Sequence, residues 1–217
     1  MRSGGARPVR VDNLPERLRQ AFLDHGYDRM TMSDLAEHCG FSRRALYHHF
    51  SNKEEAFRHW LDFFGRESIA RGVAAGRRML EEGGSAADVI VEIMNVRYGD
   101  ARRRLALSPH ALEINEQAFR RCRDVMIGAA VDFQEKVTDI IVELEGRGLL
   151  RLKPDVTPSA LAQSLCDGAR GTNQALPPIA VDQLVVRYRQ IIEAILFGAA
   201  LPPASSRPAA LRRLSAD

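Results

Sequence analysis

The stretch "GFSRRALYHHFSNKEE", residues 40–55, decides the fold. Two arginines, a tyrosine and two histidines lie within the seven residues 43–49, and no acidic residue lies between Gly40 and Lys53. The chain as a whole is nearly balanced, with 31 basic and 28 acidic residues. Ser42 and Ser51 stand where helices typically begin, because a serine oxygen can accept a free backbone N–H there. The stretch therefore predicts two consecutive helices, the first rich in cations and aromatic rings.

The polar side chains of the first of these helices gather on one face. At 100° per residue, Arg43 and Tyr47 share a face that Arg44 extends, whereas Leu46 and Phe50 point the other way. A helix with an apolar inner face and a basic, hydrogen-bonding outer face fits the DNA major groove. A solvated basic surface is the alternative interpretation of the same pattern.

The neighbouring segments also have the spacing and end signals of helices. Apolar residues recur at helical intervals over residues 12–25. Thr31 with Asp34 predicts the capped start of a second helix, and Ser51 with Glu54 predicts a capping box for a fourth. Two short helices joined by a three-residue turn that contains glycine, between longer helices, have the sequence form of a helix-turn-helix.

Helical spacing continues through the rest of the chain, and alternation of period two is absent. The sequence therefore predicts an all-α fold of about nine helices: an N-terminal three-helix helix-turn-helix domain and a C-terminal helical domain. Beyond the fourth helix we expect helices at about 85–107, 109–116, 117–146, 157–174 and 179–200. The expected domain organisation is a flexible arm at 1–11, the helix-turn-helix domain at 12–58, an effector-binding and dimerisation domain at 59–200, and a mobile tail at 201–217.

Composition excludes several classes of protein. The three cysteines (Cys39, Cys122 and Cys166) are far apart and odd in number, which fits a reducing, cytoplasmic location. No apolar run approaches the length of a membrane span, and no apolar segment follows the basic N-terminus as in a secretory signal. G-x-S-x-G, H-E-x-x-H, P-loop and Rossmann glycine patterns are all absent. We therefore expect neither an enzyme nor a metal site, and no cofactor.

The segment "GYDRMTMSDLAEHCGFSRRALYHHFSNKEEAF", residues 26–57, resembles the DNA-binding domain of the tetracycline-repressor (TetR) family. The likeness covers about 32 contiguous residues without a gap, and Met30, Arg44 and Ala56 depart from the usual pattern. Residues 60–200 share only a generic likeness, which includes the joint "GRGLLRLKPDVTP". The matching residues are Gly26-Tyr27, Thr31, Asp34-Leu35-Ala36, Gly40-Phe41-Ser42, Leu46-Tyr47, His49-Phe50 and Lys53-Glu54-Glu55.

The resemblance implies roles in DNA binding. Tyr47 and Lys53 would contact phosphates, and Arg43, Arg44 and His48 would contact base edges or the backbone. Apart from the resemblance, the helix dipole and the free N–H groups after Ser51 favour a phosphate beside Lys53. Thr31 would cap the second helix and donate to a phosphate. Arg44 is the candidate for guanine, because arginine pairs bidentately with its O6 and N7 atoms. His49 and Cys39 are expected to serve mainly in packing. The DNA-binding set is Thr31, Ser42, Arg43, Arg44, Tyr47, His48 and Lys53.

The last two helices suggest a homodimer. On a helical wheel, the polar residues of 179–200 fall within an arc of roughly 160°. The remaining apolar arc is wider than an amphipathic surface helix needs to pack on one core. The preceding helix is rich in small residues, which permit close approach of another helix. The resemblance implies a four-helix bundle with a second copy, whereas a monomeric core helix is the alternative. The expected interface is Leu161, Leu165, Gly168, Leu184, Val185, Tyr188, Ile191, Ile192 and Ile195.

The middle helices would enclose an effector pocket in a family member. Methionines and aromatic rings suit an adaptable apolar cavity, although such residues also build ordinary cores. The candidates are Phe64, Met79, Met94, Arg97, Tyr98, His110, Phe119, Cys122, Met126 and Phe133, with Glu113 or Asn115 as further polar anchors. The arginine runs at 101–104 and 120–123 are expected to be solvated, or else to hold an anionic effector such as a coenzyme A thioester.

The function that the resemblance implies is a repressor that binds an inverted-repeat operator in double-stranded DNA as a homodimer. A small, largely apolar effector would release it. The alternatives are an activator, a regulator that needs its ligand to bind DNA, and a helical ligand-binding, interaction or membrane-surface protein without a DNA function.

Overall fold

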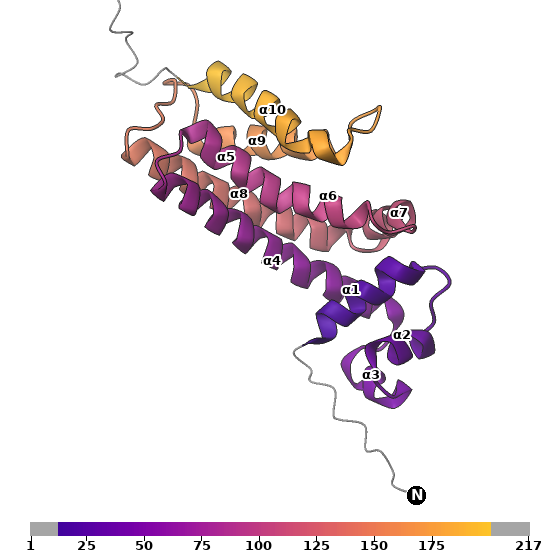
Figure 1. The fold of residues 1–217 in the computed structure, drawn as a ribbon. Coiled ribbons are helices and arrows are strands. Elements are labelled where there is room, and N and C mark those ends of the chain that lie inside the picture. Colours follow the sequence, from indigo (N-terminus) through magenta and orange to yellow (C-terminus); the bar gives the residue numbers. More distant parts are fainter. Residues whose placement is uncertain (1–12, 201–217) are drawn as a thin grey trace, which may run out of the picture. The chain divides into compact units, whose positions relative to one another are not determined.

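The computed structural model describes residues 13–200, so the arm expected at 1–11 and the tail expected at 201–217 lie outside the described residues. The ribbon of the described part is helical almost throughout (Figure 1). An isolated antiparallel bridge between Leu152 and Ala200 is the only β-type pairing among residues 13–200. The α-helices are α1 (Leu14–His25), α2 (Met32–Cys39), α3 (Arg43–His49), α4 (Lys53–Glu81), α5 (Ala86–Met94), α6 (Asp100–Leu105), α7 (Ala111–Arg121), α8 (Arg123–Gly146), α9 (Pro158–Asn173) and α10 (Leu184–Ala199).

The prediction of an all-α fold is confirmed. A π-helical turn, η2 (Asn95–Gly99), joins α5 to α6 without a break, so the helix expected at 85–107 contains one irregular turn. A short 3-10 helix, η3 (Val181–Gln183), precedes α10. The break expected after residue 116 is wrong, since α7 continues to Arg121 and α8 begins at Arg123. Neither glycine nor proline marks the true break at Cys122, so the sequence carries no local signal for it.

The described residues form two compact units. The first contains residues 13–71 and 100–132, and the second contains residues 72–99 and 133–200. The long helices α4 and α8 contribute residues to both units. This division by packing differs from the domain boundary expected after residue 58, which stays a prediction.

The first unit has an aromatic core under the helix-turn-helix. The Phe22 ring lies 5.0 Å from the Phe57 ring and 5.4 Å from the Trp60 ring, between centroids. Leu18 of α1, Leu35 of α2 and the three rings are each at most 6% exposed. Burial of such side chains stabilises a fold by about 1.5–3 kcal/mol each. These contacts hold α1, α2 and the start of α4 around the short helix α3.

Local caps fix where these helices begin. Thr31 and Asp34 form the predicted capping box of α2, and the Ser42 hydroxyl accepts the Ala45 N–H at 3.1 Å to start α3. The capping box predicted for α4 is wrong by one residue. Asn52 Oδ1 accepts the Glu55 N–H at 2.9 Å, and the Glu55 carboxylate accepts the Ser51 N–H at 2.6 Å. An asparagine oxygen caps as well as a serine oxygen, so the sequence offered two adjacent solutions.

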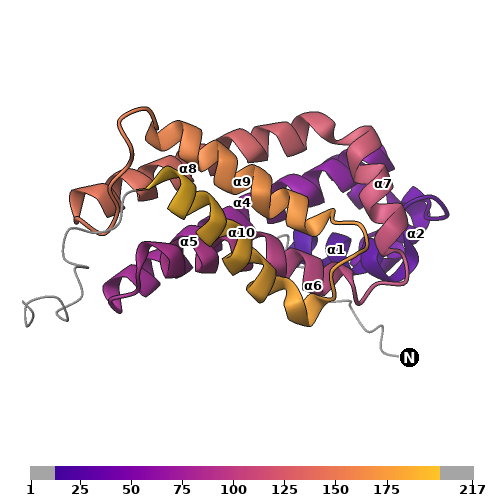
Figure 2. The ribbon, with the colours of Figure 1, turned by 90° about the horizontal axis from the view of Figure 1, so that it is seen from above.

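In the second unit, α10 packs along α9 and α5 (Figure 2). Ile90 and Met94 of α5, Phe133 of α8 and Tyr188 of α10 are fully buried there. The Tyr188 hydroxyl donates a hydrogen bond of 2.5 Å to Asn173 Oδ1 at the end of α9. The inner face of α10 is therefore committed to the core of its own protomer.

Candidate nucleic-acid interface

Helix α3 has the two faces that its sequence predicted. Leu46 and Phe50, at 0% and 5% exposure, enter the core of the first unit. The outer positions Ser42, Arg43, Arg44, Tyr47 and His48 are all exposed. The outer face of α3 thus presents hydrogen-bonding groups to solvent, while Leu46 and Phe50 attach the helix to the core.

The two arginines of α3 differ in their surroundings. The Arg43 guanidinium carbon lies 5.6 Å from the centroid of the Tyr47 ring, a cation–π distance. Tyr47 is 42% exposed and so presents both its hydroxyl and the stacked arginine to solvent. No hydrogen bond or ion pair to another described residue involves Arg44. Arg43 is therefore oriented in advance, whereas Arg44 is free to adapt to a ligand.

Thr31 is engaged in capping. Its hydroxyl accepts the Asp34 N–H at 3.2 Å and donates to Asp34 Oδ2 at 2.8 Å. The Thr31 backbone N–H donates to the same Asp34 oxygen at 2.9 Å. These donors hold the pKa of the Asp34 carboxyl below its ordinary value. A phosphate contact by the Thr31 hydroxyl would have to replace its bond to Asp34.

Lys53 is also held by its own chain. Its Nζ atom donates to the Tyr27 carbonyl at 2.6 Å and to the Asp28 carbonyl at 3.3 Å. The ammonium also lies 4.3 Å from the centroid of the Tyr27 ring. Burial lowers the pKa of Lys53, because it disfavours the charged form. The phosphate contact expected of Lys53 stays a prediction. Its ammonium already has partners in the connection between α1 and α2 (residues 26–31), which we call the α1–α2 turn.

The start of α4 is less open to an anion than the sequence suggested. The Glu55 carboxylate already accepts the Ser51 N–H. A shallow surface depression beside it is lined by Tyr27, Asn52, Lys53, Glu54, Glu55 and Arg58, two of which are acidic. The expected phosphate site after Ser51 would therefore compete with a carboxylate of the chain itself.

The two residues expected to serve in packing behave differently. Cys39 is fully buried, and burial raises the pKa of its thiol to about 11. His49 is exposed, although its ring makes an edge contact with Phe41 at 5.5 Å between centroids. His49 thus lies at the border of the exposed face of α3.

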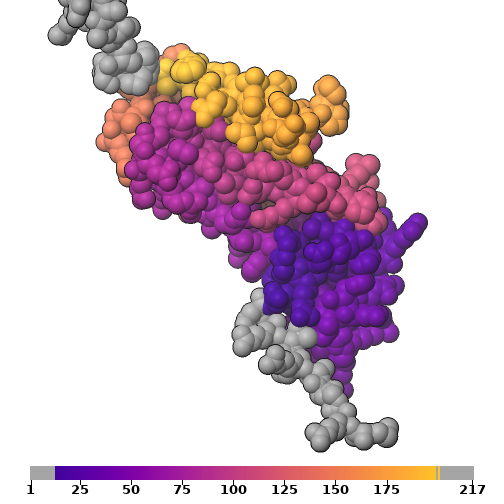
Figure 3. Space-filling view, viewed as in Figure 1, coloured from indigo at the N-terminus to yellow at the C-terminus, as the bar shows by residue number. Residues whose placement is uncertain are grey.

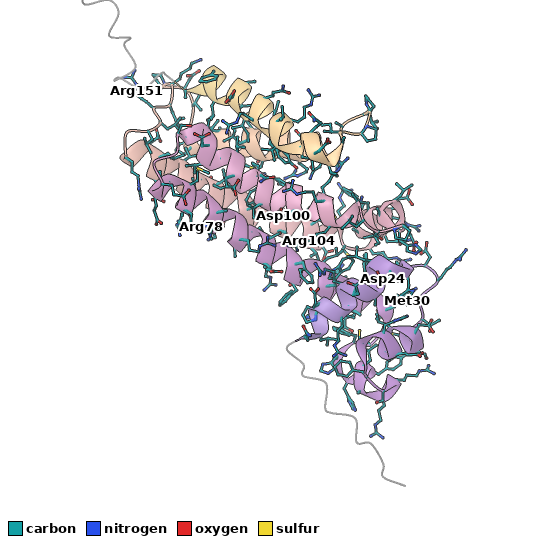
Figure 4. The ribbon with its side chains drawn as sticks, in the orientation of Figure 1. Asp24, Met30, Arg78, Asp100, Arg104 and Arg151 are labelled. Carbon is teal, nitrogen blue, oxygen red and sulfur yellow. The ribbon has the colours of Figure 1, made fainter. Side chains whose placement is uncertain are left out.

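A set of polar residues on α7 contacts the α1–α2 turn, which sequence analysis missed. Glu113 Oε1 accepts the backbone N–H groups of Tyr27 at 2.7 Å and Asp28 at 2.6 Å. Glu113 Oε2 lies 3.1 Å from His110 Nδ1. Figure 4 labels Asp24, near the end of α1, and Met30, inside the connection that precedes α2. The roles of His110 and Glu113 as effector anchors stay predictions, and both side chains already have partners at or beside the turn.

The same face of α7 makes further contacts one and two turns later. Gln117, which is 5% exposed, donates from Nε2 to Asp28 Oδ1 at 2.8 Å. Arg121 donates from Nη1 to Glu54 Oε2 at 2.7 Å, and its guanidinium carbon lies 4.9 Å from the Tyr27 ring centroid. The helical spacing of residues 113, 117 and 121 was visible in the sequence, but nothing in it pointed to the turn.

The ten effector candidates divide equally between the two units. In the second unit, the Tyr98 and Phe133 rings lie 5.5 Å apart, and the Arg97 guanidinium carbon lies within 5.6 Å of both centroids. Met94 is buried and Met79 is half-buried. In the first unit, Phe64 and Met126 pack against the core that contains Cys122, whereas Phe119 is 49% exposed. Asn115, a further candidate, is exposed.

The expected dimer residues are mostly inside the protomer. Val185 is 41% exposed. Gly168, Ile191 and Ile195 are half-buried, with the two isoleucines packed against the glycine. Leu161, Leu165, Leu184, Tyr188 and Ile192 are at most 1% exposed. Those five cannot also face a second copy, because a fully buried side chain has no surface left to offer. This burial favours the alternative of a core helix for the apolar arc of α10, and the dimer interface stays a prediction.

Two features are absent from the described part of the chain. Among residues 13–200, no helix is long and apolar enough to cross a membrane. The same part of the chain holds no group of three or more histidine, cysteine or acidic residues placed to bind a metal ion. The exposed basic face of α3 on a small helical core is typical of a helix-turn-helix DNA-binding protein.

Comparison with known proteins agrees with this class. Residues 16–59 match the sequence profile of "Bacterial regulatory proteins, tetR family". A probable HTH-type transcriptional regulator ArpR of Pseudomonas putida is 28% identical over 174 residues, 75% of this chain and 79% of that protein. The HTH-type transcriptional repressor AcnR of Corynebacterium efficiens is 35% identical over 114 residues, 52% of this chain and 53% of that protein.

Solved structures share the fold. A TetR transcription regulator from Haloarcula marismortui superposes with a TM-score of 0.67 at 16% identity, covering 88% of this chain and 97% of that chain. SmeT, repressor of a Stenotrophomonas maltophilia multidrug efflux pump, superposes with a TM-score of 0.57 at 14% identity, covering 89% and 94%. Residues 16–59 therefore form a DNA-binding domain of the TetR family, and the described chain as a whole shares the fold of regulators in that family.

Proposed function

We propose that the chain represses transcription by binding an inverted-repeat operator as a homodimer, and that a small organic ligand releases it. The observation that carries the proposal is the outer face of α3, where Arg43, Arg44, Tyr47 and His48 are exposed above two buried anchors. A helix of this kind inserts its N-terminal residues into the major groove. AcnR, which matches half of this chain, is named a repressor. The proposal places the chain in the cytoplasm with its DNA and gives it no catalytic role.

Roles within α3 follow from the surroundings of its side chains. Arg44 is the residue proposed to read a guanine, because its guanidinium has no hydrogen-bond or ion-pair partner among the described residues and lies near the helix N-terminus. Arg43 and Tyr47, stacked on each other, are proposed to contact the phosphate backbone together. Ser42 supports them by capping the helix.

The proposed dimer surface is the outer face of α9 and α10, opposite the buried set. On α9 it comprises the small exposed residues Ala160, Ser164 and Gly171, which allow a partner helix to approach closely. On α10, coloured yellow in Figure 3, it includes Val186, Ala194 and Phe197, the last of them 77% exposed. A phenylalanine this exposed is suited to burial against a second copy.

The ligand is proposed to bind in the second unit, near Arg97, Tyr98 and Phe133. Two aromatic rings and a guanidinium in mutual contact can hold an aromatic molecule by stacking and hydrogen bonding. SmeT has been solved in complex with triclosan, which makes triclosan a suitable first probe. A rise in melting temperature with triclosan that disappears in Tyr98→Ala, but not in the exposed control Phe63→Ala, would support this location.

Selection of binding sites from a random duplex pool tests the DNA-binding proposal. The salt concentration must be held near the physiological value, because phosphate contacts make affinity steeply salt-dependent. The expected result is an enriched inverted repeat whose half-sites lie about one helical turn apart. Enrichment of single half-sites would contradict the dimer, and no enrichment with or without candidate ligands would contradict the operator-binding function.

A further inference from the structure

The α1–α2 turn has backbone donors that the helices cannot satisfy. Gly26 ends α1 with a φ of 75°, so the N–H groups of Tyr27 and Asp28 point away from the helix. Tyr27 is buried, and the backbone N–H group of a buried residue needs a hydrogen-bond partner. Both N–H groups converge on one oxygen of Glu113, at 2.7 and 2.6 Å. A carboxylate that accepts backbone N–H bonds makes stronger hydrogen bonds than a neutral acceptor does.

The fit between Glu113 and the turn is close. A Cβ atom on Gly26 would collide with the Glu113 carboxylate and would lie 2.8 Å from His110 Nδ1. The positive φ of residue 26 favours glycine, and a side chain there would also displace the Glu113 carboxylate and the His110 ring. Ser108 adds a contact nearby, because its hydroxyl donates to the Leu23 carbonyl at 2.5 Å.

The contacts continue from the turn to the beginning of α4. Tyr27 lies between two cations, with Lys53 Nζ at 4.3 Å and the Arg121 guanidinium carbon at 4.9 Å from its ring centroid. Arg121 is further joined to Glu54, the second residue of α4. Only three residues separate α3 from α4. Displacement of the α1–α2 turn would therefore shift the beginning of α4, and with it the C-terminal end of α3.

We propose that Glu113 is a positioning residue for DNA binding, which fixes the α1–α2 turn and, through Tyr27 and Lys53, the placement of α3 on the duplex. Glu113 itself touches no nucleic acid in this role. The inference rests on the DNA-binding function and adds to it a residue about 60 positions beyond the helix-turn-helix that nothing in the comparisons assigns. Gln117 and Arg121 support the same turn.

The test compares operator affinity in three variants of the full chain. Glu113→Ala removes the acceptor, and we expect its affinity for the selected duplex to fall at least tenfold. Glu113→Gln keeps an oxygen that can accept both N–H groups, so it should recover most of the loss. Glu116→Ala is the matched control, because Glu116 lies on the exposed side of the same helix and has no hydrogen-bond partner among the described residues.

The amide variant separates positioning from a loss of charge. Glu113→Ala should lower affinity at every salt concentration, whereas Glu113→Gln should bind nearly like the unaltered chain. An unchanged affinity in a folded Glu113→Ala protein would overturn the proposal, and so would an equal loss of affinity in a folded Glu113→Gln protein.

A second measurement keeps the proposal testable if Glu113→Ala does not fold. Hydrogen exchange on the unaltered chain should show the Tyr27 and Asp28 amide protons protected well beyond the rates of an unstructured peptide. Exchange of both at unprotected rates would overturn the proposal. Failure of the DNA-binding function would look different, because the unaltered chain and the Glu116→Ala control would then also bind no duplex.

Discussion

The ammonium group of Lys53 lies over the ring of Tyr27 and donates to the carbonyl of the same residue, at 4.3 and 2.6 Å. One side chain at the start of α4 thus holds both the backbone and the ring of a residue in the α1–α2 turn. Burial raises the pKa of the Tyr27 hydroxyl despite the opposing effect of Arg121, so the ring stays neutral between its two cations near neutral pH.

Tyr27→Leu should destabilise the first unit. It removes two cation–π contacts and part of a buried ring, so we expect the free energy of unfolding to fall by about 1–3 kcal/mol. Urea denaturation followed by circular dichroism measures this change. Tyr47→Leu is the control, because Tyr47 is 42% exposed and its replacement should change stability by less than about 0.5 kcal/mol. Equal losses in the two variants would contradict the assigned role of the Tyr27 ring.

Arg44→Ala should relax sequence specificity. Loss of a bidentate arginine–guanine pair costs about 1–3 kcal/mol at the base it reads and little on a duplex that lacks that guanine. Titration of the selected operator and of its single-base variants measures both effects. Arg66→Ala, an exposed position on α4, is the matched control and should bind like the unaltered chain. A uniform loss across all duplexes would instead make Arg44 a phosphate contact.

Acid should weaken the Glu113 contact. Burial tends to raise the pKa of Glu113, but the N–H donors of Asp28 and Tyr27 together with His110 hold it below the ordinary value of 4.5. A carboxyl whose pKa is lowered by folding stabilises the fold above its unfolded pKa, and that contribution disappears as the pH falls through the folded pKa. Stability should therefore drop below about pH 4.5.

Comparison with Glu113→Gln isolates this effect. The amide does not titrate, so the unfolding free energy of the variant should depend less steeply on pH in the same acidic range. Urea midpoints collected at intervals below pH 6 would show the difference. Parallel pH profiles for the two proteins would mean that Glu113 has the same pKa in the folded and unfolded chains.

Phe197→Asp should separate the proposed dimer. The substitution replaces the large apolar side chain of the proposed contact by a charge, whose desolvation without a partner is costly. We expect a monomer in sedimentation velocity at concentrations where the unaltered chain is a dimer. Val142→Asp, at another exposed apolar position of the second unit, should leave the dimer intact. Dissociation by Val142→Asp alone would move the interface from α10 to α8.

The three cysteines should be inert in the folded chain. Burial raises the pKa of the Cys39 and Cys122 thiols to about 11 and that of Cys166 to about 12. The reactive thiolate is therefore scarce near neutral pH, and all three sulfur atoms belong to buried residues. An aromatic disulfide reagent at pH 8 should titrate the thiols rapidly only after denaturant is added. Fast reaction of one thiol under native conditions would identify a segment that opens locally.

The sequence by itself determined the features that depend on neighbours within one or two helical turns. The caps at Thr31 and Ser42 are visible in it, because a capping side chain bonds to a backbone group only two or three residues away. The two faces of α3 are visible for the same reason, since the helical period alone separates Leu46 from Arg43. The family resemblance of residues 26–57 rests on these local features.

Tertiary structure decided which faces meet. Periodicity marks the arc of α10 that contains Leu184, Tyr188 and Ile192 as apolar, but it cannot say whether the same protomer or a second copy buries that arc. Likewise, Glu113 and Tyr27 are 86 residues apart, and their pairing depends on how α7 packs beside the α1–α2 turn. Hydrogen bonds and apolar burial act only over a few ångströms, so partners distant in sequence are settled only when the chain has folded.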